Sequence, residues 1–497
     1  MARNEHLSTK IVIKESGPDA GSRPFSVRAL HGFPDFLSLN NLKYVKIGYV
    51  YLINFCIYFM GASSLLLAFG TKFGKLTLNI FFMKYFNSTN IVLFFGVLAV
   101  LVYVLFNLAP TVTYLIDFAC YVPPEKFKIT KEEYIELAKK SGQFNDESLK
   151  FQRRVLNTSG IGDATYLPRA VFRPGYAADF HGGREEAAML MYGAVDNLLA
   201  ATALRLNDVR ILIVNCGVFN ATPSLSAMIV NHYKLNHRIR TYNLGGMGGA
   251  AGVAAVDLAN NLLKAYPPSY ALIVSTEVLR YTWYAGGDSD MILPNCFLRL
   301  GAAAVLLSNR RRDRWRCKYQ LKQLVRTHKH TDDRSYRSIY LREDSGGRRG
   351  LSVSKDMIEL AGDALKANIK SLNSLVLPIS ERFHFFKSLI FRKSSDKPAF
   401  EHICILATSK KVLDRIQEDL DLADEFMEAS RKTLERFGNS SSSSIWYELA
   451  YLEAQNRINN GDRVWQLALG SGLDCNSVFW KAVRNVREVK RNPWERD

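Results

Sequence analysis

The features of disulfide-rich and metal-binding proteins are missing from this sequence. Its 497 residues include seven cysteines, and no two of them form a CxxC pair or another spacing typical of zinc ligands. We therefore expect neither a disulfide framework nor a metal site, and reduced thiols facing the cytosol fit the pattern. Nucleic-acid-binding motifs are also missing, so no nucleic acid partner is expected. A chain of this length can bury a large core, as two or three domains or as one duplicated fold.

Charged side chains are absent from two long apolar runs, Ile47–Gly70 and Tyr85–Ile116. Each run can cross a bilayer, which takes about 20 apolar residues. A polar tail precedes the first run, which therefore does not resemble a cleavable signal peptide. The sequence predicts a polar tail at 1–44 and a two-span transmembrane hairpin at 45–116, with two buried core helices as the alternative. Lysines on the flanks of the hairpin favour cytosolic termini.

Acidic side chains are in the minority: 65 Lys and Arg face 47 Asp and Glu, which gives a net charge of +18. The positive charge is concentrated in Asn309–Lys318 and Lys481–Arg496. Basic stretches beside a membrane anchor can contact anionic lipid or attract ligands that carry phosphate. A solvated basic face is the alternative interpretation.

Beyond Asp117 short apolar runs alternate with longer segments of helical spacing, which is typical of an α/β fold. The predicted strands are Ile211–Asn215, Tyr270–Ser275, Ala302–Leu307, Ile403–Ala407 and Arg463–Leu469. The predicted helices are Ala187–Leu206, Ala250–Ala265, Lys355–Leu372, Lys411–Leu422 and Ile445–Ile458. The charged stretch Arg310–Arg349 is predicted as a surface hairpin or excursion that turns at Asp344–Gly347. A second half begins after it, which divides the soluble part into 117–375 and 376–497.

Cys216 lies where an apolar strand ends, in the run VNCGVFNATPSLSAM, shortly before a predicted helix. Unpaired backbone N–H groups and the positive end of a helix dipole both favour a thiolate over a thiol. Cys216 is therefore a candidate nucleophile. The alternative is an inert core cysteine, because free cysteines are often buried as small hydrophobes.

Three further segments carry candidate site residues. The segment NLGGMGGAAG, at Asn243–Gly252, has no clear strand leading into it, so close packing of a helix explains it better than a dinucleotide loop. Gly470 and Gly472 follow the last predicted strand, where a backbone N–H could face an oxyanion or the glycines could simply form a turn. Asn439 precedes a serine run that N-capping explains, and its amide is either a turn residue or a donor to a thioester carbonyl.

Taken together, seven motifs resemble the plant 3-ketoacyl-CoA synthases, the condensing enzymes of very-long-chain fatty acid elongation. The motifs are VNCGVFNATPSLSAM, NLGGMGGAAG, STEVLRYTWYAGG, RTHKHTDDRSYRSIY, EHICILATSKK, RFGNSSSSSIWYELAYLE and RVWQLALGSG. The resemblance covers nearly the whole chain and keeps the order and spacing of the motifs.

This resemblance implies a thiolase-like, five-layered αβαβα fold of two similar halves behind a two-helix anchor. It also implies acyl-CoA and malonyl-CoA as substrates, no cofactor, and an endoplasmic reticulum membrane location with the catalytic body facing the cytosol. Cys216 would accept the acyl chain as a thioester, and Asn439 would help to hold the malonyl thioester and its enolate. The expected partner is a second copy, another condensing enzyme or another elongase subunit.

The family's catalytic histidine is missing. Active members have His-Ala-Gly-Gly after the strand of the second half, whereas this chain has leucine at Leu406, which can neither donate a hydrogen bond nor carry a proton. His402 matches an earlier family histidine and lies about 13 Å from position 406 along an extended strand, too far for a simple exchange of roles. His328 matches another family histidine and is predicted to be structural. Both histidines remain candidates for a supporting role.

Other departures cluster around the same predicted catalytic floor. Gly249 and Ala250 replace a Cys-Ser pair, Val278 replaces an asparagine, and Thr408 and Ser409 replace the glycine pair. Losing one oxyanion donor typically lowers the rate by about 10² to 10³. The sequence therefore predicts a condensing enzyme with weak or absent activity. The alternative is a catalytically impaired homologue that binds and regulates active condensing enzymes, and a soluble polyketide synthase is disfavoured by the anchor.

Overall fold

A computed structural model describes residues 96–98, 101, 112–375, 400–487 and 491–495. Nearly all of these residues belong to one compact unit, Pro110–Asp497. The predicted tail and the two apolar runs lie almost entirely outside the described residues, so the structure does not test the anchor. Within the described part of the chain, no helix has the length and apolar character needed to span a bilayer.

The first group of strands has the order β1-β7-β6-β4-β5. Its members are β1 (Tyr114–Tyr121), β4 (Val209–Asn215), β5 (Arg240–Leu244), β6 (Tyr270–Thr276) and β7 (Ala302–Ser308). β4 is parallel to β5 and β6, whereas β7 is antiparallel to β6 and β1. Every residue of β6 and β7 is buried, as expected for apolar strands covered on both faces.

The second group repeats this pairing with the order β8-β13-β12-β11. Its members are β8 (Tyr319–His328), β11 (His402–Ile405), β12 (Arg463–Leu469) and β13 (Asp474–Ala482). β12 is parallel to β11, and β13 is antiparallel to β12 and β8. The second group therefore repeats the order and directions of β1, β7, β6 and β4, and no described strand of it corresponds to β5. A short contact between β1 and β8 joins the two groups into one nine-stranded sheet.

Two predicted boundaries are wrong. β1 begins at Tyr114, inside the range 45–116 assigned to the hairpin, because this end of the apolar run is buried between neighbouring strands. β8 belongs to the second group, so the sheet does not divide at residue 375 as the ranges 117–375 and 376–497 required. The predicted surface stretch Arg310–Arg349 thus contains a central strand.

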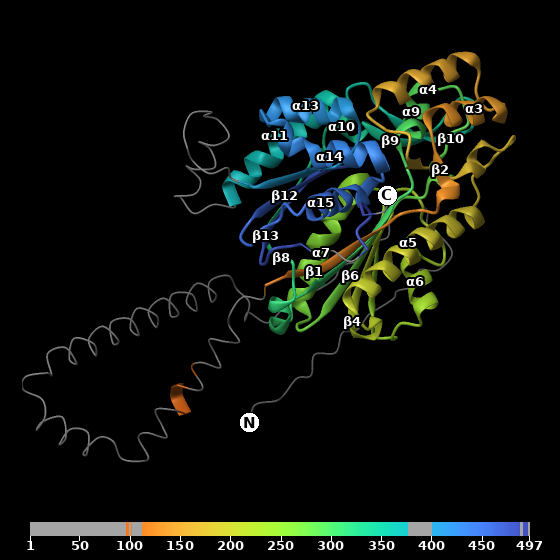
Figure 1. Ribbon diagram of the computed structural model, residues 1–497. Coiled ribbons are helices and arrows are strands. Elements are labelled where there is room, and N and C mark those ends of the chain that lie inside the picture. Colours follow the sequence, from red (N-terminus) through yellow and green to blue (C-terminus); the bar gives the residue numbers. More distant parts are fainter. Residues whose placement is uncertain (1–95, 99–100, 102–111, 376–399, 488–490, 496–497) are drawn as a thin grey trace, which may run out of the picture. The chain divides into compact units, whose positions relative to one another are not determined.

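Helices cover and separate the two strand groups in five layers (Figure 1). On the outer face of the first group lie α5 (Phe180–Thr202) and α6 (Leu225–Tyr233). α7 (Ala251–Ala265) and α15 (Ser444–Ala454) each contact strands of both groups and form the middle layer. The outer face of the second group is covered by three helices, α11 (Met357–Leu375), α13 (Lys410–Leu420) and α14 (Asp424–Phe437).

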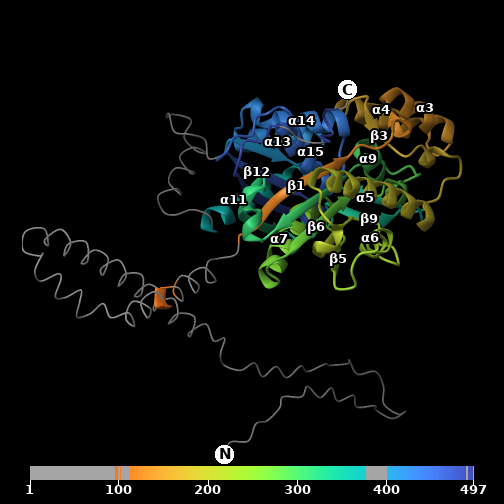
Figure 2. The same cartoon turned by 60° about the horizontal axis from the view of Figure 1, so that its bottom comes forward.

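Figure 2 shows α3, α4 and α9 together at one end of the unit. The smaller elements are α3 (Lys131–Ser141), α4 (Asp146–Thr158), α8 (Leu279–Thr282), α9 (Ser289–Phe297), α10 (Asp333–Tyr336) and two short strand pairs. The pairs are β2 (Lys128–Ile129) with β3 (Thr165–Tyr166), and β9 (Ile339–Glu343) with β10 (Arg349–Val353). The carboxylate of Asp344 accepts the N–H groups of Gly346 and Arg348, which confirms the predicted turn between β9 and β10.

Candidate active site

Cys216 directly follows β4, as the strand prediction required. Its N–H donates to the carbonyl of Leu244 on β5, which fixes the backbone at the carboxyl end of the sheet. The helix that follows, α6, begins only at Leu225 and is capped by Ser224. The predicted arrangement, a thiol immediately before a helix, is therefore not observed, and Cys216 lies outside the first turn of α6 along the chain, within which a helix dipole acts.

Glu277 is the polar group in contact with the thiol, and the sequence analysis missed it. The Sγ atom of Cys216 lies 3.4 Å from Oε1 of Glu277, which follows the neighbouring strand β6. The same carboxylate accepts the N–H groups of Gly217 at 2.9 Å and Val218 at 3.2 Å. A Cβ on Gly217 would lie 2.6 Å from Glu277 Oε2, so glycine permits this approach. Two sequence signals were available: an acidic residue at the end of a buried strand, and its place in the motif STEVLRYTWYAGG.

The surroundings of Cys216 favour the neutral thiol. Burial raises the pKa of Cys216 well above its usual value, the Glu277 carboxylate raises it further, and the backbone N–H groups of Phe219 and Val218 oppose these effects. Burial also raises the pKa of Glu277, against hydrogen bonds from Val218 and Gly217. A thiolate at this position consequently needs a proton acceptor or a charge partner, and the backbone alone does not supply one.

A cavity of about 1100 Å³ opens beside the thiol. Cys216 itself is 2% exposed, and its neighbours Gly217 and Val218 line the cavity together with Glu277. Both halves of the fold contribute to the wall, as expected for a site between them. The predicted residues on this wall are Leu406, Asn439, Gly470 and Gly472. The structure thus brings together predicted residues from three segments that are distant in sequence.

Asn439 is held rigidly by its neighbours. Its Oδ1 accepts the N–H of Ser441 at 2.9 Å, and its Nδ2 lies 3.4 Å from the carbonyl oxygen of Thr408. The N-capping explanation of the serine run is wrong, because Ser443 precedes α15 without a side-chain cap. The serines instead connect the two halves: Ser442 donates to Asn215 of β4. Asn439 therefore presents its amide in a fixed orientation on the cavity wall.

The side chain of Leu406 packs against Gly249, a position that has no side chain of its own. Leu406 follows β11, is 2% exposed, and donates its N–H to Leu467 at 2.9 Å. A Cβ added at Gly249 would overlap Cδ2 of Leu406 and would lie 2.6 Å from the carbonyl oxygen of Leu469. The departures at positions 249 and 406 are therefore sterically coupled, because the leucine packs where a side chain at 249 would be.

The glycine segments serve close packing. β5 leads into NLGGMGGAAG, so the expectation that no strand precedes this segment is wrong, although a Cβ on Gly252 would lie 2.6 Å from the Ser442 carbonyl, as close packing requires. In the second loop the N–H of Gly470 already donates to the carbonyl of Asp474 at 2.9 Å. Gly470 therefore does not present a free amide to an oxyanion. Gly472 has a φ of +67°, which favours glycine.

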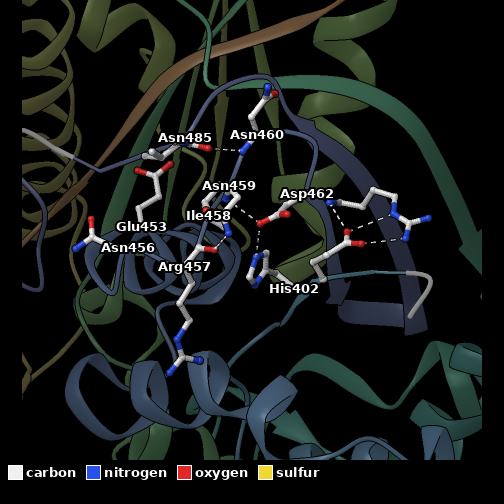
Figure 3. Close-up of polar contacts among 12 residues, drawn as sticks. His402, Glu453, Asn456, Arg457, Ile458, Asn459, Asn460, Asp462 and Asn485 are labelled. Carbon is white, nitrogen blue, oxygen red and sulfur yellow. Dashed lines mark hydrogen bonds and ion pairs between the residues drawn. The ribbon is translucent and has the colours of Figure 1, made fainter. Parts of the chain in front are cut away.

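The two predicted supporting histidines lie in different surroundings. His402, the first residue of β11, places Nε2 3.0 Å from Oδ2 of Asp462, which also accepts the N–H of Asn459 (Figure 3). His402 is not part of the cavity wall. His328, the last residue of β8, stacks on His330 with ring centres 4.8 Å apart. Only His330, which the sequence analysis did not single out, lines the cavity among the histidines of the described residues.

Comparison with known proteins decides the family. A family model described as FAE1/Type III polyketide synthase-like protein matches residues 106–394, and the model of the 3-oxoacyl-(acyl-carrier-protein) synthase III C terminal matches residues 396–482. 3-ketoacyl-CoA synthase 4 of Arabidopsis thaliana is 45% identical over 493 residues, covering 96% of this chain and 95% of that protein. This chain belongs to the 3-ketoacyl-CoA synthase family. A second member, 3-ketoacyl-CoA synthase 11 of the same plant, is 45% identical over 95% of this chain and 96% of its own length.

Solved structures show the fold of the family. A fungal type III polyketide synthase, ORAS, matches with a TM-score of 0.61 and 18% identity over 74% of this chain and 99% of its own. The 1,3,6,8-tetrahydroxynaphthalene synthase of Streptomyces coelicolor A3(2) matches with a TM-score of 0.61 and 19% identity over the same shares. CsyB complexed with CoA-SH matches with a TM-score of 0.60 and 17% identity over 74% of this chain and 100% of its own. The thiolase-like α/β fold predicted for this synthase is thus confirmed.

Proposed function

We propose that this chain is a slow condensing enzyme of very-long-chain fatty acid elongation, anchored in the endoplasmic reticulum membrane. It loads an acyl group from long-chain acyl-CoA onto Cys216 and then condenses that group with malonyl-CoA at a low rate. The observation that carries the proposal is the shared cavity wall, on which Asn439 and Leu406 both lie. The resemblance to the family implies that Leu406 stands where active members have a histidine. Membership of the 3-ketoacyl-CoA synthase family supports the reaction class.

The loading step requires a nucleophile and an acceptor for its hydrogen bond, and Cys216 and Glu277 supply them. The Cys216 sulfur attacks the thioester carbon of acyl-CoA, the bond from that carbon to the CoA sulfur breaks, and the thiol proton ends on the CoA sulfur. Glu277 lies 3.4 Å from the thiol and can accept its hydrogen bond during the attack. Because the pKa of Cys216 is raised, the thiolate fraction at neutral pH is small and loading is slow.

The malonyl step lacks one of the hydrogen-bond donors that would stabilise the enolate oxygen. Loss of CO₂ from malonyl-CoA places negative charge on the thioester oxygen, and preorganised donors stabilise this enolate. The amide of Asn439 supplies one donor, whereas the leucine side chain at 406 supplies none. Since one lost oxyanion donor costs about 10² to 10³ in rate, we expect condensation at that fraction of the rate of histidine-bearing relatives.

The proposal is tested with microsomes that contain the full-length chain and long-chain acyl-CoA. Mass spectrometry should find an acyl adduct on Cys216, and labelled malonyl-CoA should give a small yield of product extended by C2. The matched control is Leu406→Met, which keeps an apolar side chain of similar volume and should leave the yield unchanged. An unmodified Cys216 after exposure to a range of acyl-CoA lengths would overturn the proposal.

A second candidate function rests on the same leucine. If condensation is absent, the chain would act by pairing with an active condensing enzyme or elongase subunit, or with a second copy of itself. β5 lies at the end of the strand order and has a partner on one side only among the described strands, and such an edge can pair with another chain. Failure to co-purify with any condensing enzyme or elongase subunit would count against this role.

A further inference from the structure

The basic run Asn309–Lys318 contains a short 3₁₀ helix, η6 (Arg311–Trp315). Its only acidic residue, Asp313, is buried. The carboxylate of Asp313 accepts hydrogen bonds from Oγ of Ser308 at 2.6 Å and from Nε of Arg316 at 2.9 Å. The negative charge of the run is therefore matched by Arg316 inside the fold and does not pair with the arginines at the surface.

The cations of this run fall into two groups, those with partners inside the fold and those at the surface. Nζ of Lys318 is buried and lies 2.6 Å from Oδ1 of Asp117 and 2.8 Å from Oε2 of Glu453. Arg312 and Arg314 are exposed, and no ion pair joins either guanidinium to any residue that the structure describes. These two arginines are therefore available to an anion from outside the chain.

More positive charge lies beside η6, on β8 and at the end of β13. Burial lowers the pKa of Lys322, and the nearby positive charges of Lys481 and Arg314 lower it further. Arg484 lies close enough to Cys317 to oppose the effect of burial, which raises the pKa of that thiol to about 11. Among the described residues none of these exposed cations has an ion-pair partner. An anionic surface at this place would relieve their mutual repulsion.

Trp315 adds a large aromatic ring to this basic surface. It ends η6, next to Arg314, and is 80% exposed, more than any other large hydrophobic residue in the part of the chain that the structure describes. A tryptophan combines an apolar ring with an N–H donor, and such rings favour the headgroup level of a membrane. The basic surface around Trp315 therefore has the composition of a membrane contact and differs from an ordinary solvated face.

η6 lies where the chain enters the folded unit. It contacts β1, and the N–H of Lys318 donates to the carbonyl of Leu115 on that strand at 3.0 Å. The apolar run Tyr85–Ile116 leads directly into β1. A membrane span in this run would therefore end close in sequence to the strand that η6 contacts. The apolar run and the basic surface are independent features, and both favour lipid at this end of the sheet.

We propose that η6 rests on an anionic phospholipid surface, with Trp315 among the headgroups and Arg312 and Arg314 on lipid phosphates. The inference goes beyond the condensation chemistry and rests only on the membrane location in the proposed function. β4 begins at the same end of the sheet, because its first residue pairs with Tyr270 of β6 and Tyr270 pairs with Ser308. Cys216 follows the other end of β4, about 20 Å further along the strand, so docking through η6 holds the reactive sulfur away from the lipid.

The test uses the full-length chain reconstituted in liposomes whose lipids carry bromine on their acyl chains, because bromine quenches the fluorescence of nearby tryptophans. All six tryptophans lie in described residues, and Trp315 alone is exposed. Quenching should be strong in phosphatidylcholine mixed with phosphatidylserine and weak in phosphatidylcholine alone. Trp315→Phe should remove the quenching, whereas the matched control Trp494→Phe, which changes a half-buried ring, should keep it.

A second pair of variants tests the charges. Because each basic residue near an anionic surface contributes about fivefold to binding, Arg312→Glu combined with Arg314→Glu should lower the ratio of docked to undocked protein at least about 25-fold. Most of the quenching in the anionic liposomes should disappear. The control is Arg153→Glu, an exposed arginine on α4 whose neighbour Arg154 lines the cavity. It should leave the quenching unchanged, since charges far from the contact are screened by salt.

Three results would overturn the inference. Equal quenching with and without phosphatidylserine would remove the role of the charges, and equal losses from the charge-reversed variant and Arg153→Glu would remove the role of η6. No quenching of Trp315 in the anionic liposomes would exclude a lipid contact and leave an acidic protein as the occupant. The acyl adduct on Cys216 is measured in the same liposomes and decides separately whether the proposed condensation stands. The charge-reversed variant should still form it.

Discussion

The carboxyl ends of β4 and β11 occupy equivalent places in the repeated topology, yet they carry opposite chemistry. Each strand is parallel to a neighbour, β6 or β12, that also ends at the cavity. β4 is followed by Cys216, which meets the carboxylate of Glu277, whereas β11 is followed by Leu406, which meets the backbone at Gly249. Both side chains are 2% exposed. The comparison teaches that the fold places the two positions equally well and that the side chains alone decide the reactivity.

The largest effect is expected from removing the thiol of Cys216. Cys216→Ala should abolish the acyl adduct and all C2 extension, because the proposed loading step forms its thioester on this sulfur. Cys296→Ala is the matched control, since Cys296 is also fully buried and lies in α9. Mass spectrometry of intact protein after exposure to acyl-CoA measures the adduct. An adduct that survives in Cys216→Ala would show that another residue accepts the acyl group.

The next largest effect concerns the packing of Leu406 against position 249. Gly249→Cys should destabilise the chain, since overpacking a core typically costs about 1–3 kcal/mol and here Leu406 Cδ2 and the Leu469 carbonyl both obstruct the new side chain. Adding Leu406→Ala should restore part of the melting temperature, because only the side-chain clash is relieved. The control is Gly287→Cys, where a Cβ meets no atom within 4 Å. Equal melting temperatures for Gly249→Cys with and without Leu406→Ala would contradict the coupling.

A smaller effect is expected from neutralising the partner of the thiol. Glu277→Gln removes a negative charge that raises the pKa of Cys216, so the thiolate fraction at a fixed pH should increase. Alkylation of Cys216 by iodoacetamide at pH 8 should then become several-fold faster, as followed by mass spectrometry. Slower alkylation would mean that the carboxylate promotes loss of the thiol proton and does not suppress it.

The smallest effect concerns a buried carboxylate on α5 that supports the Cys216 side of the cavity. Glu186 accepts the N–H groups of Leu279 and Arg280, and burial raises its pKa to about 8. A folded-state pKa above the unfolded value stabilises the protein at low pH, and this stabilisation is lost as the pH rises through about 8. Glu186→Gln should therefore flatten the dependence of melting temperature on pH between 5 and 8. An unchanged slope would exclude Glu186 as its source.

The strands nearest the site were predictable because they are continuous apolar runs. β12 was predicted at its observed bounds, and β4, β6 and β7 within two residues. The first three residues of β1, Tyr114–Ile116, were assigned to the end of a predicted membrane span, since a strand buried on both faces is as apolar as a membrane-spanning segment. β5 was missed because an edge strand with the sequence RTYNL has no apolar pattern.

The candidate site was predictable only where a motif marked it. Cys216 was a candidate from its position at the end of an apolar strand, and Asn439 and Leu406 gained their roles through the family motifs. The cavity wall contains Asn439, Leu406 and the residues next to Cys216. Glu277 and His330 lie within two of the quoted motifs but were not singled out, because their contacts are made across the fold. Glu277 reaches a thiol 61 positions earlier in the chain, and His330 finds its carboxylate on β13. No local spacing records such contacts.

The measurement that tests the central claim most directly is C2 extension by the natural chain beside Leu406→His, in microsomes with equal amounts of each protein. We predict that the histidine variant is faster by about 10² to 10³, the typical value of one oxyanion donor, with equal acyl loading of Cys216 in both. Equal extension rates for the two proteins would contradict the account, because leucine at position 406 would then not limit condensation.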